Sequence, residues 1–165
     1  MIRKTLFFYV AIFTILIASC AKVVNTTSLN IKKDAVYTVL PFENLTETPL
    51  AGLRVASIVE GVAVSKGYKV KNGLYGMESK EYTKQDIDSI ISKVKDSGVD
   101  YVITGSVNEF RYKTGIDGEP AVSITLKIYD VKNDKVVLTN VGSKTGWSHE
   151  SVGTVTQKLI NSLLH

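Results

Sequence analysis

Apolar residues recur with helical periodicity in three stretches of the chain. Residues 50–65, the segment after Thr83, and residues 150–164 carry apolar side chains three to four positions apart, which predicts three amphipathic helices. Thr83 is placed to cap the second helix and Gly98 to end it. The apolar stripes are Val55, Ile58, Val59 and Val62; Ile87, Ile90, Ile91 and Val94; and Val152, Val155, Leu159 and Leu163.

Shorter apolar runs predict strands before, between and after these helices. Residues 35–40 form a run that ends at Pro41, and residues 68–71 alternate briefly. Residues 100–112 and 135–141 predict two longer strands. The clearest alternation lies between these two and places Val122, Ile124, Leu126 and Ile128 on one face and Ser123, Thr125, Lys127 and Tyr129 on the other.

These elements follow one another in the order βαβαβββα, with a hairpin turn at Asn133 and Asp134 joining the last two strands. A mixed sheet of about five strands, with helices packed on it and covering one face, buries the apolar stripes together. The pattern therefore predicts a single α/β (α+β) domain of three-layer-like architecture over residues 34–165, a usual size for one domain.

The N-terminus has the features of a bacterial lipoprotein signal. Arg3 and Lys4 precede an apolar run over residues 6–17, and two small residues then lead to Cys20. About 12 apolar residues are too few for a hydrocarbon core that needs about 20, so the run predicts a cleavable signal, residues 1–19. An ordinary signal peptide with a chance cysteine is the alternative. Cys20 is the only cysteine, which excludes a disulfide within the chain.

A lipid on Cys20 would anchor the mature chain to a membrane. Several acyl chains such as palmitate hold durably, because each buried methylene contributes about 0.8 kcal/mol. The next residue is Ala21 rather than the aspartate that commonly retains lipoproteins at the inner membrane, which favours the periplasmic face of the outer membrane. Residues 20–33 are polar and predict a tether, whose flexible part of roughly 13 residues spans about 20 Å. The domain is therefore expected to lie close to its membrane.

Charge excludes one class of partner. The chain has 20 Lys and Arg against 16 Asp and Glu. Arg3 and Lys4 belong to the predicted signal, which leaves 18 against 16 and a net charge of +2 for the mature chain. No run of basic residues is interleaved with aromatic ones, so nucleic acid is not expected as a partner.

No constellation for catalysis is evident in the chain. His149 and His165 lack the spacing of a metal pair, and no phosphate-binding or nucleophile motif stands at a strand-to-helix junction. We therefore expect no enzyme activity, no metal and no cofactor. Asp117 and Glu119 are close in sequence, but a turn rich in Asp and Gly explains them more simply than paired acids do. Trp147, the only tryptophan, is compatible with core packing or with contact to a membrane interface.

Four blocks of the chain resemble one family. Residues 39–44, 102–112, 113–122 and 142–151 together are similar to the PelC family of outer-membrane lipoproteins, over about residues 34–164. Lys144 and Thr145 depart from the small or basic residues expected before Gly146 and Trp147. More distantly, the element order resembles the TolB N-terminal, CsgG and peptidoglycan-synthase-activator domains.

The resemblance implies a non-catalytic role in Pel exopolysaccharide export. It implies a homo-oligomeric ring, a dodecamer, on the periplasmic side of the outer membrane, beside a β-barrel exporter of the PelB type. It also implies an acidic inner surface that guides a cationic polymer, a role that falls on Asp117, and a bilayer contact that falls on Trp147. Because the net charge is slightly positive, the acids must be concentrated on one surface, for which Glu119 and Asp130 are further candidates.

Three other functions are weighed against this one. An interaction lipoprotein that activates a peptidoglycan synthase would need a longer tether than residues 20–33. A CsgG-like pore would turn the apolar face that begins at Val122 toward lipid and leave the helices without a partner sheet. An enzyme lacks its catalytic residues.

Overall fold

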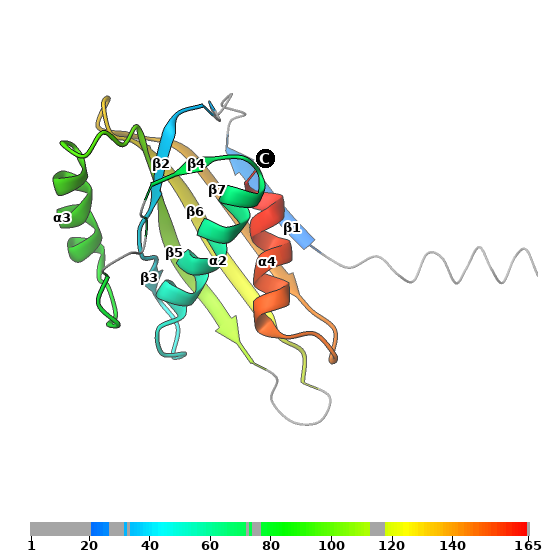
Figure 1. The fold of residues 1–165 in the computed structure, drawn as a ribbon. Helices are drawn as coiled ribbons and strands as arrows, with labels where there is room; N and C mark the ends of the chain where they lie inside the picture. The colour runs from blue at the N-terminus through cyan, green and yellow to red at the C-terminus, as the bar shows by residue number, and fades with distance from the viewer. Residues whose placement is uncertain are drawn as a thin grey trace, which may run out of the picture.

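The computed structural model describes residues 21–26, 32, 34–71, 73, 77–112 and 118–164. In these ranges, the chain forms a seven-stranded sheet and three helices (Figure 1). The strands are β1 (Ala21–Thr26), β2 (Val36–Val39), β3 (Glu43–Asn44), β4 (Lys69–Val70), β5 (Tyr101–Arg111), β6 (Ala121–Asp130) and β7 (Lys135–Thr145). The helices are α2 (Ala51–Ser65), α3 (Lys84–Val94) and α4 (Val152–Leu163).

The sheet is mixed, with the strand order β1-β7-β6-β5-β2-β4, and β3 pairs with β5. The pairs β5/β6, β6/β7 and β1/β7 are antiparallel, whereas β2 and β3 run parallel to β5. The predicted strands and helices are all present, and the predicted mixed α/β class is confirmed. β3 is an addition of two residues that continues the line of β2 along β5.

The main core lies between the sheet and the helices α2 and α4. The predicted alternation on β6 is confirmed, because Val122, Ile124, Leu126 and Ile128 are all buried. They pack with the predicted stripe of α4 and with Val55, Val59 and Val62 of α2 in one cluster. Burial of this continuous apolar face is the main source of the fold's stability.

Helix α3 departs from the expectation that the helices cover one face. Its buried residue Ile87 packs with Val102 and Leu40, whereas the adjacent Ile103 belongs to the core under α2 and α4. Because neighbouring residues of a strand point to opposite faces, α3 lies on the other side of the sheet, as Figure 1 shows. Only Ile87 of the four residues in the α3 stripe is fully buried. Helix α3 therefore covers its face of the sheet less completely than α2 and α4 cover theirs.

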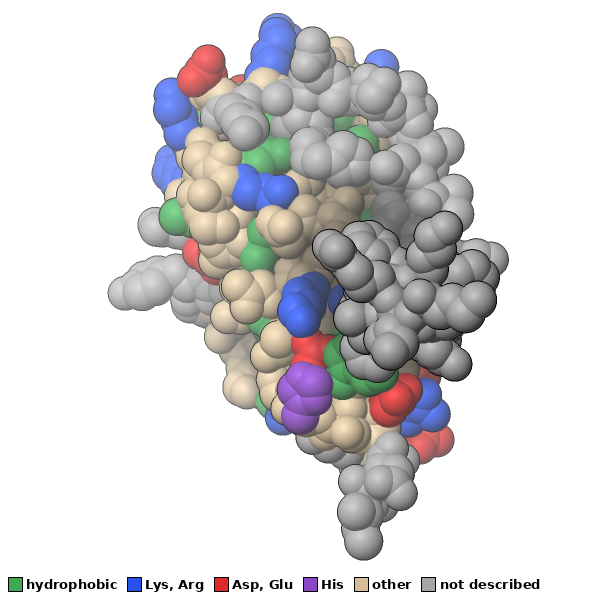
Figure 2. All heavy atoms as spheres, turned by 90° about the vertical axis from the view of Figure 1, so that its right-hand side faces the viewer, with side chains coloured by type: hydrophobic (Ala, Val, Ile, Leu, Met, Phe, Trp, Pro, Cys, Tyr) green, Lys and Arg blue, Asp and Glu red, His purple; other side chains and the backbone are tan. Residues whose placement is uncertain are grey.

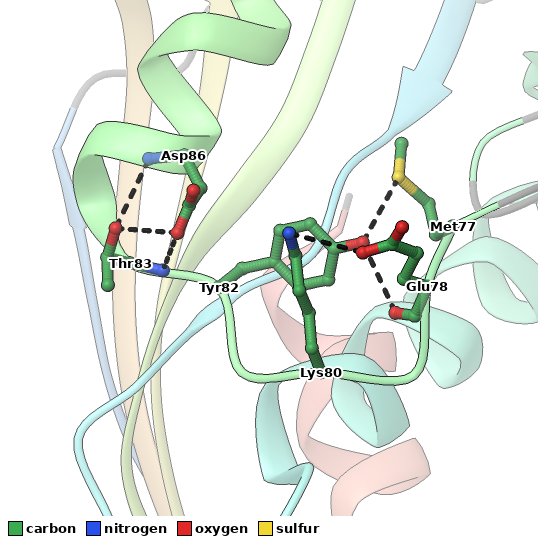
Figure 3. Close-up of polar contacts among 6 residues, drawn as sticks. All are labelled: Met77, Glu78, Lys80, Tyr82, Thr83 and Asp86. Atoms are coloured by element: carbon green, nitrogen blue, oxygen red, sulfur yellow. Dashed lines mark hydrogen bonds and ion pairs between the residues drawn. The ribbon is translucent and has the colours of Figure 1, made fainter.

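The start of α3 is as predicted. Thr83 caps the helix by accepting the N–H of Asp86 at 3.2 Å, and the Asp86 carboxylate accepts the N–H of Thr83 at 2.9 Å (Figure 3). This reciprocal capping box satisfies two backbone donors that the first turn leaves unpaired. The Thr83 hydroxyl, which donates to the Asp86 carboxylate at 2.7 Å, and then the Thr83 N–H hold the pKa of Asp86 below its ordinary value.

Residues 21–26 differ from the expected tether. They form β1, which pairs with β7 from Ala21 opposite Lys144 to Thr26 opposite Thr139. An edge strand can be added through main-chain hydrogen bonds alone, so the polar composition that suggested a tether does not prevent pairing. The spacer between residue 20 and the sheet is therefore absent, while Cys20 itself lies outside the described residues.

Candidate functional site

The turn between β7 and α4 holds the single tryptophan. Gly146 opens this turn, and its N–H donates to the carbonyl oxygen of Pro120 at 2.8 Å. A Cβ at Gly146 would lie 2.3 Å from Cγ2 of Val155, so only glycine fits there without displacement. At the other end, Ser151 caps α4 by accepting the N–H of Thr154 at 3.1 Å. The turn is thus fixed at both ends.

A carboxylate inside the turn fixes its middle. Glu150 is only 8% exposed, and its Oε2 accepts the N–H of Trp147 at 3.0 Å. The N–H of Glu150 donates in return to the carbonyl oxygen of Trp147 at 2.9 Å. Its other oxygen forms an ion pair with Lys158 of α4. The hydrogen bond from Lys158 and then that from Trp147 hold the pKa of Glu150 below its ordinary value.

The Trp147 side chain points outward from this braced backbone. It is 52% exposed and belongs to neither hydrophobic cluster of the described residues. Of the two alternatives that the sequence left open, core packing is therefore excluded. A half-exposed indole on a rigid turn has the amphipathic character favoured at a membrane interface.

The N-terminal strand begins beside this turn. Ala21 is opposite Lys144, three residues before Trp147, and Cys20 is covalently bonded to Ala21. Across the next pair, Ala121 is opposite Thr145, which brings the start of β6 to the same end of the sheet. The segment that could carry a lipid and the exposed indole therefore belong to one end of the sheet.

The candidate acidic residues are distributed differently from what the sequence suggested. Glu119 is exposed and directly precedes Pro120, which bonds to the tryptophan turn. Asp117 lies outside the described residues. In Figure 1 the end of β5, the start of β6 and the β7–α4 turn all lie at the lower end of the sheet. Figure 2 shows acidic, basic, hydrophobic and histidine side chains mixed together on the lower part of the face that it displays.

Asp130 is at the opposite end of β6 from Glu119. A strand of this length extends for about 30 Å, so the two residues do not form one acidic surface in a single subunit. Asp130 is 8% exposed, and its oxygens accept the backbone and side-chain N–H groups of Asn133, each at 2.8 Å. Burial alone would raise the pKa of Asp130, but these hydrogen bonds hold it below its ordinary value. Its observed role is to stabilise the β6–β7 hairpin.

Two further acids lie near Asp130, where sequence reasoning did not place them. Asp34 and Asp100 line a shallow cavity of about 570 Å³ with Asp130 and the cations Lys32 and Lys132. Only the folded sheet brings these positions together, because they come from the starts of two strands and the end of a third.

Glu150 and Lys158 are also residues that the sequence analysis did not single out. Their spacing of eight positions, about two helical turns, is a signal that could have suggested a shared face.

Within the described ranges, no group of three or more His, Cys, Asp or Glu side chains could hold a metal ion. None of the described helices has the length and apolar character needed to cross a membrane.

Acid should release the tryptophan turn through Glu150. Its folded-state pKa is lowered, so the stability it contributes is present above its ordinary pKa of 4.5 and is lost as pH falls through the lower, folded value. We expect acrylamide quenching of Trp147 fluorescence to increase below about pH 4.5 in the native protein. Glu150→Gln should show high quenching already at pH 7 and lose this acid transition.

The matched control is Glu119→Gln, which neutralises a nearby exposed carboxylate that does not bond to the turn. It should keep the native transition. An identical acid transition in the native protein and Glu150→Gln would show that the carboxylate does not hold the turn.

Comparisons with known proteins give clear structural relatives. No protein-family model matches the chain, and no curated protein matches it. A PelC dodecamer from Paraburkholderia phytofirmans is 29% identical with a TM-score of 0.72, and a point variant, also a dodecamer, is 31% identical with a TM-score of 0.75. Each alignment covers 88% of this chain and 96% of the other. The lipoprotein GNA1162 from Neisseria meningitidis shares the fold, with 20% identity, a TM-score of 0.56, and coverage of 78% and 96% of the two chains.

Proposed function

The chain belongs to the PelC family, and we propose that it is a lipid-anchored ring subunit that assists export of a cationic exopolysaccharide. The ring stands on the periplasmic face of the outer membrane beside a β-barrel exporter of the PelB type. The role is non-catalytic, since the subunit binds, positions and guides. PelC from Paraburkholderia phytofirmans, a dodecamer both in its native form and as a point variant, supports the ring.

The observation that carries the membrane orientation is the position of the exposed indole. Trp147 is braced by Glu150 at the end of the sheet where β1 begins, one residue after Cys20. A lipid on Cys20 would bring this end to the bilayer with little freedom, because β1 is already part of the sheet. The indole would then enter the interface as a second contact.

The acidic surface of the proposed ring depends on symmetry rather than on net charge. The mature chain has two more cations than anions, so a general field does not attract a cationic polymer. A closed ring repeats each exposed acid once per subunit, which turns one residue into a band. Asp117 and Glu119 are the candidates for this band, whereas the carboxylate of Asp130 is occupied by Asn133 in the hairpin.

Reversing the charge of the band tests this function. In cells that depend on a plasmid copy of the gene, we expect Asp117→Lys to reduce secreted polymer several-fold with unchanged protein level, because a like charge would repel the cationic chain. Glu60→Lys makes the same change at a half-buried position on α2 and should leave secretion unchanged.

The oligomeric state is measured in parallel by light scattering of the detergent-solubilised protein. A monomer under conditions in which export is active would contradict the ring. Normal secretion by Asp117→Lys would remove that residue from the acidic band.

A further inference from the structure

Helix α3 is braced mainly at its two ends. Before its N-terminus, the Tyr82 hydroxyl donates to the carbonyl oxygen of Glu78 at 3.2 Å, and the Lys80 ammonium lies 5.3 Å from the ring centroid (Figure 3). After its C-terminus, Nζ of Lys95 lies 2.8 Å from Oδ1 of Asp134 in the β6–β7 turn. Asp134 also accepts a hydrogen bond from the hydroxyl of Tyr129. The Lys95–Asp134 ion pair ties the C-terminal end of α3 to the β6–β7 turn, and Tyr82, before the N-terminal end, packs with Leu40 and Val102 of the sheet region.

A cleft of about 370 Å³ lies between α3 and the sheet. Its volume falls in the range of about 300–1,000 Å³ typical of small-ligand pockets. Ile87 and Ile91 of α3 and Val136 of β7 supply apolar surface, while Thr104 and Ser106 of β5 supply hydroxyl groups. The lining therefore offers an apolar wall together with groups that can donate and accept hydrogen bonds.

Charge within the cleft is balanced in two pairs. Lys84 Nζ lies 2.7 Å from Asp88, and Lys95 pairs with Asp134. The carboxylate of Glu43 also lines the cleft but takes part in none of the ion pairs found among the described residues. Lys127 also lines the cleft outside these ion pairs, and Lys84 attracts Glu43 only at longer range, so a ligand cation that enters the cleft can form the close ion pair that Glu43 lacks.

We propose that the cleft between α3 and the sheet binds one amino-sugar unit of the exported polymer, with its ammonium group at Glu43. A hexosamine has hydroxyls for both donors and acceptors and a ring face for the apolar wall. An acyl chain would pair with neither Glu43 nor Lys127, and a phosphate would meet the carboxylate of Glu43 as well as the ammonium of Lys127. The proposal rests on the export function above and adds a recognition site remote from the tryptophan turn.

Calorimetry with two pentasaccharides tests the charge requirement. The probes are a glucosamine pentamer, which is cationic, and cellopentaose, which is neutral, titrated into the full-length protein in detergent. We expect the glucosamine pentamer to bind and Glu43→Gln to weaken its binding about fivefold or more. Lys127→Met removes a like charge from the cleft and should strengthen binding, whereas Glu60→Gln on the other side of the sheet should have no effect.

Methyl NMR locates the bound sugar. The methyl signals of Ile87 and Ile91 should shift on addition of the glucosamine pentamer, while those of Ile160 in the other core should not. Equal binding of both probes, absence of binding, or shifts confined to the tryptophan turn would overturn the proposal. So would Ile87 and Ile91 signals that change on subunit assembly and not with the sugar, which would make the cleft a subunit contact. Because binding is measured on purified protein, its failure is distinct from a failure of export in cells.

Discussion

Gly105→Ala should destabilise the protein by about 3 kcal/mol or more, a large part of the roughly 5–15 kcal/mol that stabilises a typical domain. A Cβ at Gly105 would lie 1.9 Å from the carbonyl oxygen of Thr125 and 2.9 Å from the ring of Phe42. Neither neighbour can move easily, because Thr125 lies within the paired strand β6 and Phe42 is buried in the core. Thermal unfolding followed by circular dichroism should show a melting temperature lower by about 10 °C.

Gly61→Ala is the matched control. Gly61 lies within α2, where a Cβ would meet nothing within 4 Å, so alanine should stabilise the protein by about 0.5–1 kcal/mol. A lower melting temperature for Gly105→Ala and a higher one for Gly61→Ala would show that the space available for a Cβ decides the change in stability, rather than the loss of a glycine as such. Equal melting temperatures would mean that β5 and β6 can separate at Gly105 at little cost.

Cys20→Ser should release the protein from the membrane fraction. Without a thiol for the lipid, the acyl chains that contribute about 0.8 kcal/mol per buried methylene are lost, and the Trp147 interface is too small to hold the chain alone. Fractionation of cells followed by immunoblotting should find the variant in the soluble fraction. Secretion of the polymer should fall with it, since the ring would no longer stand at the exporter.

Two controls separate anchoring from orientation. Ser19→Ala keeps a small residue before the cysteine and should leave the protein in the membrane fraction. Trp147→Ala should also remain there through its lipid but lose part of its secretion activity, because the interfacial contact would be missing. Retention of Cys20→Ser in the outer-membrane fraction would contradict lipid anchoring at this residue.

The elements of this fold could be predicted because their signals are local. The alternation from Val122 to Ile128 and the stripe on α4 predicted the buried faces that the structure shows. Thr83, as a cap residue before an apolar stripe, predicted the start of α3 in the same way. Periodicity and capping depend on neighbours within about four residues, so the chain encodes them without reference to its distant parts.

The candidate site was predictable only in part. Trp147 was identified as unusual, but its surroundings were compatible with either burial or exposure. Its outward position depends on Glu150, which bonds to Lys158 two turns along α4, and on Gly146, which fits beneath Val155. These contacts join segments that meet only after α4 has packed on the sheet.

The sequence by itself determined which segments are strands and helices, which of their faces are apolar, and where a signal and a lipid site are expected. Only the tertiary structure decided that residues 21–26 join the sheet at β7, that α3 crosses the face opposite α2 and α4, and that Glu119 and Asp130 lie at opposite ends of β6. The physical reason is that strand partners, the face that a helix covers, and the exposure of a carboxylate depend on contacts between residues far apart in the chain.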